Sequence, residues 1–249
     1  HRFQDSEFIH YENILDSDSY ITRVLNENNH MLKPNTVWFI PTKVCISSHN
    51  EVKSICINKN MNCITINSEG TRLYKAGERT PINLLVDVEK KELSTILADA
   101  YQNHRLSNKP LAITGNICVS RGITISSPRM LITHAILPPS VINVANSYQT
   151  AGRVCGNFKQ YNKWVKPIVF CTNKFYQKVK VQENKSINLA KLAHTNNLDT
   201  ISREDYNLSG TNTVIKSKIF DTHDEADLFI RETMERSNPR TPWTKINGY

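Results

Sequence analysis

The chain has 249 residues, of which 39% are hydrophobic and 22% charged, a composition typical of a globular domain with a buried core. No apolar run approaches the roughly 20 residues that a membrane-spanning helix requires, which excludes such a segment. The net charge of +8 favours a polyanionic partner.

Residues 1–34 are polar and mixed. Apolar residues at helical spacing predict a helix over residues 18–29, capped by Asp16, Ser17 or Asp18. We interpret this region as a lead-in or linker that follows a preceding lobe. An N-terminal helix without a special role is the alternative.

Two strand patterns, each ending in polar residues, follow. The apolar run at residues 36–40 predicts a buried parallel strand, and Ser47 or Ser48 is expected to cap a helix over residues 49–58. Residues 62–67 predict the next strand. We expect a loop over 71–80, a short strand or turn at 84–87, and a helix over 92–104.

The central stretch repeats the pattern of a strand followed by a polar tip. Residues 111–114 predict a strand that ends in Thr114, Gly115 and Asn116, where a hydroxyl, a glycine that allows close approach, and an amide suit phosphate contacts. Gly122 marks a second tight backbone site. A strand over 130–137 is followed by a helix that begins near 139–140 and carries Gln149 and Arg153.

The last core strand is expected at residues 164–172, followed by a basic amphipathic helix or strand over 173–184. From residue 183 the composition shifts toward Asn, Ser, Thr and Asp, which favours a boundary between 182 and 188. Beyond it we expect a helix at 187–194, a strand at 213–220 and a helix capped by Thr222 and Glu225.

The six cysteines are never paired as Cys-x-x-Cys, and several lie within apolar runs. This pattern indicates reduced, buried thiols in an intracellular protein rather than a disulfide framework. The eight histidines lack ligand spacing, so no structural metal is expected. A phosphate loop and an acidic magnesium box are also absent from the sequence.

Two of these segments resemble a known family. Residues 121–124 look like motif V, and residues 149–153 like motif VI, of the second RecA-like domain of superfamily 2 helicases, and both their order and their separation fit. The resemblance covers roughly residues 35–181 and is closest in style to helicases of large DNA viruses. Because the sequence begins at His1, it is expected to be a fragment of a longer polypeptide.

The resemblance implies an α/β fold: a RecA-like three-layer sandwich with a mostly parallel central sheet, plus a small C-terminal α+β extension. The implied organisation is a lead-in over 1–34, a helicase C-terminal domain over 35–182, and an extension or the start of another module over 183–249. The implied location is intracellular, in the host cytoplasm or nucleus if the protein is viral.

The resemblance also implies the function, that of the C-terminal lobe of an ATP-dependent helicase or translocase. Its partners would be nucleic acid, with DNA favoured over RNA, and an N-terminal RecA-like lobe of the same polypeptide. That lobe would bind most of the ATP and Mg²⁺, so this piece alone is expected to be inactive. Nucleic-acid contacts are expected from a set at the strand tips: Thr42, Lys43, Ser48, Thr114, Gly115 and Asn116.

For the nucleotide, the resemblance implies contacts from Gly122, Thr124, Gln149 and Arg153, with Gln149 and Arg153 in the catalytic roles. An arginine directed at the γ-phosphate stabilises the charge that builds during transfer. The sequence departs from the family pattern at Thr124, where an acidic residue is usual, and at Gly156, where a second arginine is usual. These departures favour the alternative of a degenerate lobe that acts as a basic DNA- or RNA-binding scaffold. An unrelated Rossmann-type enzyme would need a Gly-x-Gly-x-x-Gly fingerprint, which the sequence lacks.

Overall fold

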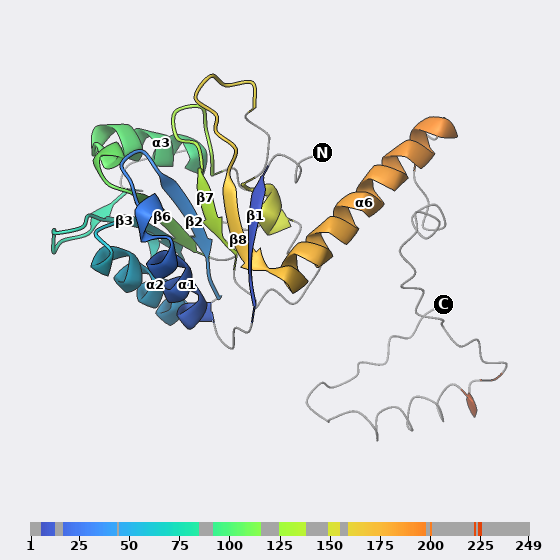
Figure 1. The fold of residues 1–249 in the computed structure, drawn as a ribbon, viewed down its shortest axis with the longest axis horizontal. Helices are drawn as coiled ribbons and strands as arrows, with labels where there is room; N and C mark the ends of the chain where they lie inside the picture. Colours follow the sequence, from blue (N-terminus) through green and yellow to red (C-terminus); the bar gives the residue numbers. More distant parts are fainter. Residues whose placement is uncertain are drawn as a thin grey trace.

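A single eight-stranded sheet organises the chain in the computed structural model (Figure 1). The strand order is β1-β8-β7-β2-β6-β3-β4-β5, and every neighbouring pair is parallel except β3–β4 and β4–β5. The residues that the structure describes are 6–12, 17–43, 45–84, 92–115, 125–137, 149–154, 159–197, 200, 222 and 224–225.

The strands are β1 (Glu7–Tyr11), β2 (Val37–Pro41), β3 (Asn62–Asn67), β4 (Gly70–Tyr74), β5 (Ile82–Asn83), β6 (Leu111–Gly115), β7 (His134–Ile136) and β8 (Ile168–Thr172). The helices are α1 (Ser17–Glu27), α2 (Ile46–Asn58), α3 (Leu93–Asn103) and α6 (Asn173–Thr195), with short 3₁₀ turns at Asn29–Met31 and Leu106–Asn108. An unlabelled helical turn covers residues 149–152.

Helices cover both faces of the sheet, which gives three layers. Along β2, Trp38 and Ile40 point to the core under α1 and α2, whereas Val37 and Phe39 point to the core under α3 and α6. Both sides of the strand are therefore buried, which is why its sequence is a continuous apolar run. The predicted α/β class with a mostly parallel central sheet is confirmed, and the arrangement is consistent with a RecA-like sandwich.

Several predicted elements are confirmed at nearly their predicted bounds, namely α1, β2, β3, α3 and β6. Others need correction. The helix α2 begins at Ile46 with Cys45 as its N-cap, so Ser47 and Ser48 lie inside the first turn instead of capping it. The strand expected over 130–137 is reduced to β7, and β8 begins only at Ile168 because the preceding Pro167 has no N–H for the ladder.

Residues 71–80 were expected to form a loop, and this prediction is wrong for its first half. Residues Gly70–Tyr74 form β4, which pairs antiparallel with β3 from Cys63↔Tyr74 to Asn67↔Gly70. Thr71 and Leu73 are buried between more exposed neighbours, the alternation of a half-covered strand. Gly70 has a φ of +114°, a conformation that closes the tight turn between the two strands.

The first strand was also missed. We expected a lead-in segment over residues 1–34, but β1 pairs in parallel with β8, from Glu7↔Ile168 to Tyr11↔Thr172. The structure therefore shows that part of this segment belongs to the central sheet, as its edge strand.

The segment after β8 is a helix rather than a strand, and it is longer than predicted. The Thr172 hydroxyl accepts a hydrogen bond from the Phe175 N–H (3.1 Å) and caps the start of α6. The helix then continues to Thr195, so the separately predicted helix over 187–194 is its second half. The Thr222 cap is confirmed by its hydrogen bond from the Glu225 N–H (3.3 Å), whereas the strand predicted at 213–220 lies outside the described residues.

The cysteine prediction is confirmed for three thiols and wrong for one. Cys56, Cys63 and Cys171 are free and buried, but Cys45 is exposed at the start of α2. The two remaining cysteines, Cys118 and Cys155, lie outside the described residues.

Candidate functional site

The carboxyl ends of β2 and β6 bring several of the predicted strand-tip residues together. The two strands are adjacent and in register, with Ile40 opposite Thr114 and Pro41 opposite Gly115. The Thr42 N–H donates to the Gly115 carbonyl (3.0 Å), which continues the pairing past the end of β2. Thr42, Thr114 and Gly115 therefore form one edge, while Asn116 lies outside the described residues.

Lys43 extends this edge and is tied to the first turn of α2. Its side chain is exposed, and its carbonyl accepts a hydrogen bond from Nε2 of His49 (2.9 Å). Because a carbonyl can only accept, His49 must carry a proton on Nε2. This hydrogen bond ties the segment between β2 and α2 to the first turn of α2, and it thereby fixes the position of the Lys43 backbone.

Two hydroxyl groups near this edge have incomplete hydrogen bonding. Within the described part of the chain, neither Ser48 Oγ nor Thr114 Oγ1 has a hydrogen-bond partner, although both are buried. A buried hydroxyl without a partner costs on the order of 1–3 kcal/mol. α2 packs on β6, and both groups come from these two elements. The two elements that flank the edge thus each hold a buried hydroxyl with unused hydrogen-bonding capacity.

Cys45 is a feature that the sequence analysis missed. It occupies the N-cap position of α2 with its thiol exposed. The adjacent Ser47 hydroxyl and Ser48 N–H lower the pKa of this thiol, as is common at helix N-termini, although its side chain makes no capping hydrogen bond. The sequence did contain a signal for this site, because Ser47 and Ser48, two residues typical of helix N-termini, follow Cys45 within three positions.

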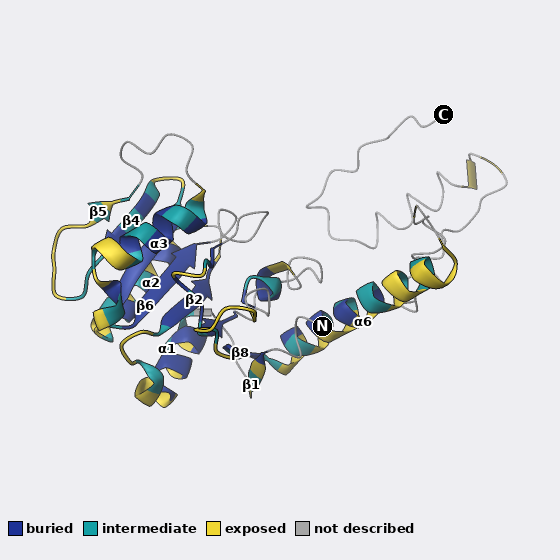
Figure 2. Ribbon diagram, turned by 90° about the horizontal axis from the view of Figure 1, so that it is seen from above, coloured by how far each residue is buried: buried dark blue, intermediate teal, exposed yellow. Residues whose placement is uncertain are grey.

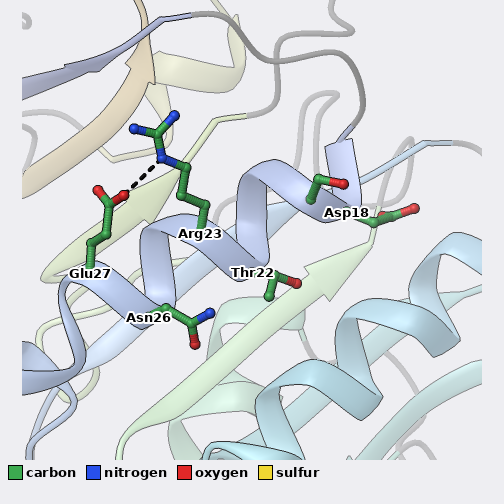
Figure 3. Close-up of a pocket in the computed structure, with 6 residues that line it drawn as sticks. Asp18, Thr22, Arg23, Asn26 and Glu27 are labelled. Atoms are coloured by element: carbon green, nitrogen blue, oxygen red, sulfur yellow. Dashed lines mark hydrogen bonds and ion pairs between the residues drawn. The ribbon is translucent and has the colours of Figure 1, made fainter.

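Asp18 and Glu51 form an acidic pair between α1 and α2. A hydrogen bond to Asp18, in the first turn of α1, raises the pKa of Glu51 on α2. Asp18 also borders a hollow on the surface of α1, together with Ser19, Thr22, Arg23, Asn26 and Glu27 (Figure 3). Its described lining comes from one helix, and Arg23 and Glu27 form an exposed ion pair there (2.8 Å). None of the predicted site residues lines this hollow.

The candidate nucleotide-binding residues lie elsewhere, in the connection from β7 to β8. Gln149 is exposed at the start of the helical turn 149–152, and the half-buried Arg153 follows it, with its N–H bonded to the Thr150 carbonyl (3.2 Å). Ala151 and Val154 anchor this turn in the core under α3 and α6. Burial lowers the pKa of the Arg153 guanidinium, which nevertheless stays charged at neutral pH.

Gly122 and Thr124, the other two residues implied for the nucleotide, lie outside the described residues. The fit to a nucleotide therefore depends on Gln149 and Arg153, which stand one helical turn apart. An exposed amide and a partly desolvated guanidinium suit phosphate oxygens, because a guanidinium donates several hydrogen bonds in one plane.

The strand pattern over residues 130–137 includes a histidine, His134, which is buried in the centre of the sheet and makes a ring stack that was not predicted. His134 stacks on Trp38 with ring centroids 4.2 Å apart, and Trp38 stacks in turn on Phe170. The Thr133 hydroxyl donates to the Val37 carbonyl (3.1 Å), so its contact with His134 Nδ1 (2.8 Å) uses the histidine N–H as donor. Burial lowers the pKa of His134 to about 4.

This histidine predicts an acid-sensitive fold. A neutral imidazole is favoured in the folded state, so its contribution is complete above pH 6.5 and is lost as the pH falls toward 4. Over that window the free energy of unfolding should decrease by roughly 3 kcal/mol because of this group. Urea unfolding of the wild-type protein and of His134→Gln at pH 4 to 7 measures this decrease in the free energy of unfolding.

The matched control is His10→Gln, because His10 is exposed on the edge strand β1. That variant should keep the full pH dependence of wild type, whereas His134→Gln should have a flatter profile. Equal slopes for wild type and His134→Gln would exclude the buried imidazole as the cause.

No protein-family model, curated protein or solved structure matches the chain. In the described ranges, no helix combines the length and apolar character needed to cross a membrane. The same ranges contain no cluster of three or more His, Cys, Asp or Glu side chains that could hold a metal ion.

Proposed function

We propose that this chain is the C-terminal RecA-like lobe of an ATP-dependent superfamily 2 helicase or translocase. The observation that carries the proposal is the meeting of Thr42, Lys43, Thr114 and Gly115 at the ends of two adjacent parallel strands. In open α/β sheets, ligands bind at this carboxyl edge. Thr42, Thr114 and Gly115 are buried, so the exposed Lys43 is the member of this set that can reach a phosphate of a nucleic-acid backbone.

Charge supports the same conclusion. The chain carries a net charge of +8, and Lys43 projects into solvent from the edge itself. Positive charge attracts a phosphate backbone over a distance set by the salt concentration. The preferred substrate is DNA, held as a single strand.

In this proposal, Gln149 and Arg153 complete a nucleotide site whose remainder lies on an N-terminal lobe. ATP with Mg²⁺ supplies the phosphoryl group whose transfer to water drives the motor. Arg153 would orient and neutralise the phosphate oxygens, and Gln149 would bind nucleotide or backbone from the same side of the helical turn. Closure and opening of the two lobes would then alternately strengthen and weaken the contacts with the nucleic-acid strand.

A second candidate is a lobe that binds nucleic acid without taking part in hydrolysis. Thr124 and Gly156, at positions where the family usually has an acidic residue and a second arginine, favour it. In this case the strand-tip edge keeps its role, and Arg153 serves only to stabilise the turn that carries it.

Both candidate functions require the strand-tip edge to bind nucleic acid, and binding of single-stranded DNA tests this requirement. Lys43→Gln should weaken binding of the 249-residue chain to a fluorescent 20-nucleotide mixed-sequence DNA about fivefold at 0.1 M salt. It should also reduce the salt slope, the slope of the logarithm of affinity against the logarithm of salt concentration, by about 0.7, since one phosphate contact is lost. Fluorescence anisotropy between 50 and 200 mM KCl measures both quantities.

Lys33→Gln is the matched control, because Lys33 is equally exposed but precedes β2, at the opposite end of the strand. It should leave the affinity close to that of wild type. If both variants weaken binding equally, the affinity comes from overall charge and the strand-tip interface is wrong.

A further inference from the structure

The long helix α6 carries a polar face that the strand-tip site does not use. Its 23 residues correspond to about 35 Å at 1.5 Å per residue. The helix starts at the carboxyl end of β8 and runs outward past the β1 edge of the sheet (Figure 1). Its buried residues, Phe175, Val179, Glu183 and Lys185, all lie before Ser186, whereas exposed residues continue to its C-terminal end (Figure 2).

The exposed side is a stripe of amides and lysines. It recurs at intervals of three and four residues, the repeat of one helix face, and comprises Asn173, Gln177, Lys180, Asn184, Asn188 and Lys191. Lys174 is exposed beside its first turn. The Gln177 amide donates to the Asn173 side chain (3.3 Å), which pairs these two amides in the first turn of the stripe.

The charge of α6 has one sign on this side. The helix contains five lysines and one glutamate, a net charge of +4 and half of the +8 of the whole chain. The glutamate, Glu183, is only 8% exposed. Along the solvent-facing side of α6, no acidic group offsets the lysines.

We propose that this stripe, the α6 face, binds the phosphate backbone of duplex DNA next to the single strand at the strand tips. The inference rests on the proposed function and adds a second contact to it. Lysine ammonium groups neutralise phosphates, while Asn and Gln side chains donate to phosphate oxygens and can bond to base edges. Lys174 and Lys191 are 17 residues apart, or about 26 Å, which spans most of one DNA turn of about 34 Å.

The shape of α6 favours duplex DNA over duplex RNA. A helix with its side chains is about 10–12 Å wide, close to the 12 Å width of the major groove of B-form DNA. The major groove of A-form RNA is too deep and narrow to admit it. An anionic membrane is disfavoured, because a membrane-surface helix needs a large apolar face. On α6, Val181 is the one large hydrophobic residue among the strongly exposed positions.

Neutralising the three exposed lysines tests the α6 face. The variant Lys174→Gln/Lys180→Gln/Lys191→Gln should reduce the affinity of the 249-residue chain for a 20-base-pair mixed-sequence DNA on the order of 100-fold at 0.1 M salt. The salt slope should decrease by about 2.7. Glutamine keeps the helix propensity of lysine, and circular dichroism checks that the helix remains.

The control is Lys33→Gln/Lys163→Gln/Lys166→Gln, which removes the same charge from exposed positions in the segments that precede β2 and β8. It should change duplex affinity less than threefold. Equal losses in the two triple variants would overturn the proposal. So would equal affinity for duplex RNA, or tighter binding to phosphatidylserine vesicles than to duplex DNA at the same salt.

The test of the α6 face and the test of the proposed helicase role can give opposite results. Loss of duplex binding in the α6 variant, with unchanged ATP hydrolysis in Arg153→Ala, would retain the α6 face and reject the helicase role. Loss of ATP hydrolysis in Arg153→Ala, together with full duplex binding in the α6 variant, would retain the helicase role and reject the α6 face.

Discussion

Replacing Arg153 with alanine is expected to reduce ATP turnover on the order of 1,000-fold in the longest polypeptide that carries this sequence, with nucleic acid present. A guanidinium that reaches the transferring phosphate stabilises the transition state, and its removal is typically worth 10³-fold or more. The half-buried position of Arg153 at the end of the turn 149–152 restricts its motion. Steady-state phosphate release at saturating ATP measures the effect.

Two further variants make the result interpretable. Arg153→Lys keeps the charge but loses the planar donor geometry, so it should restore only a small part of the turnover. Arg79→Ala removes an arginine from an exposed position after β4 and should leave turnover unchanged. Full activity in Arg153→Ala would reject the motor and leave the binding scaffold as the function of this lobe.

Replacing Trp38 with alanine is expected to lower the free energy of unfolding by about 3–5 kcal/mol. Trp38 is fully buried on β2, inside the parallel region of the sheet, and its ring stacks on those of His134 and Phe170. Its removal leaves a cavity that neighbouring strands cannot close without breaking their ladders. Urea denaturation followed by far-ultraviolet circular dichroism measures the loss.

Trp164→Ala is the matched control, since it deletes the same side chain from the loop before β8, where Trp164 is only half-buried. Its cost should stay below about 1 kcal/mol. If the two variants are equally stable, the stack of His134, Trp38 and Phe170 contributes nothing specific to the core.

Helices were predictable where a local signal was strong. The apolar spacing in α1 and α3 indicates one buried face on each helix, and the continuous apolar run in β2 indicates burial on both sides of the strand. All three elements appear as predicted. The start of α2 was misplaced because two serines looked like caps, whereas the structure uses Cys45 and buries Ser48.

The missed strands depended on partners distant in sequence. β1 is stabilised by its ladder with β8, about 160 residues away, and its own burial pattern is too weak to distinguish it from a polar lead-in. The ring stack of His134 has the same origin, since it depends on Trp38 of β2, which stacks in turn on Phe170 of β8.

The sequence by itself determined the fold class and the polar residues at the ends of the strands, because burial on both faces of a sheet and the end of each apolar run impose residue patterns that can be recognised locally. Only the tertiary structure decided which tips are adjacent, that β1 closes one edge of the sheet, and that the polar face of α6 projects beyond it. Strand order and helix direction follow from ladder pairing and packing between distant segments, and no short stretch of sequence encodes them.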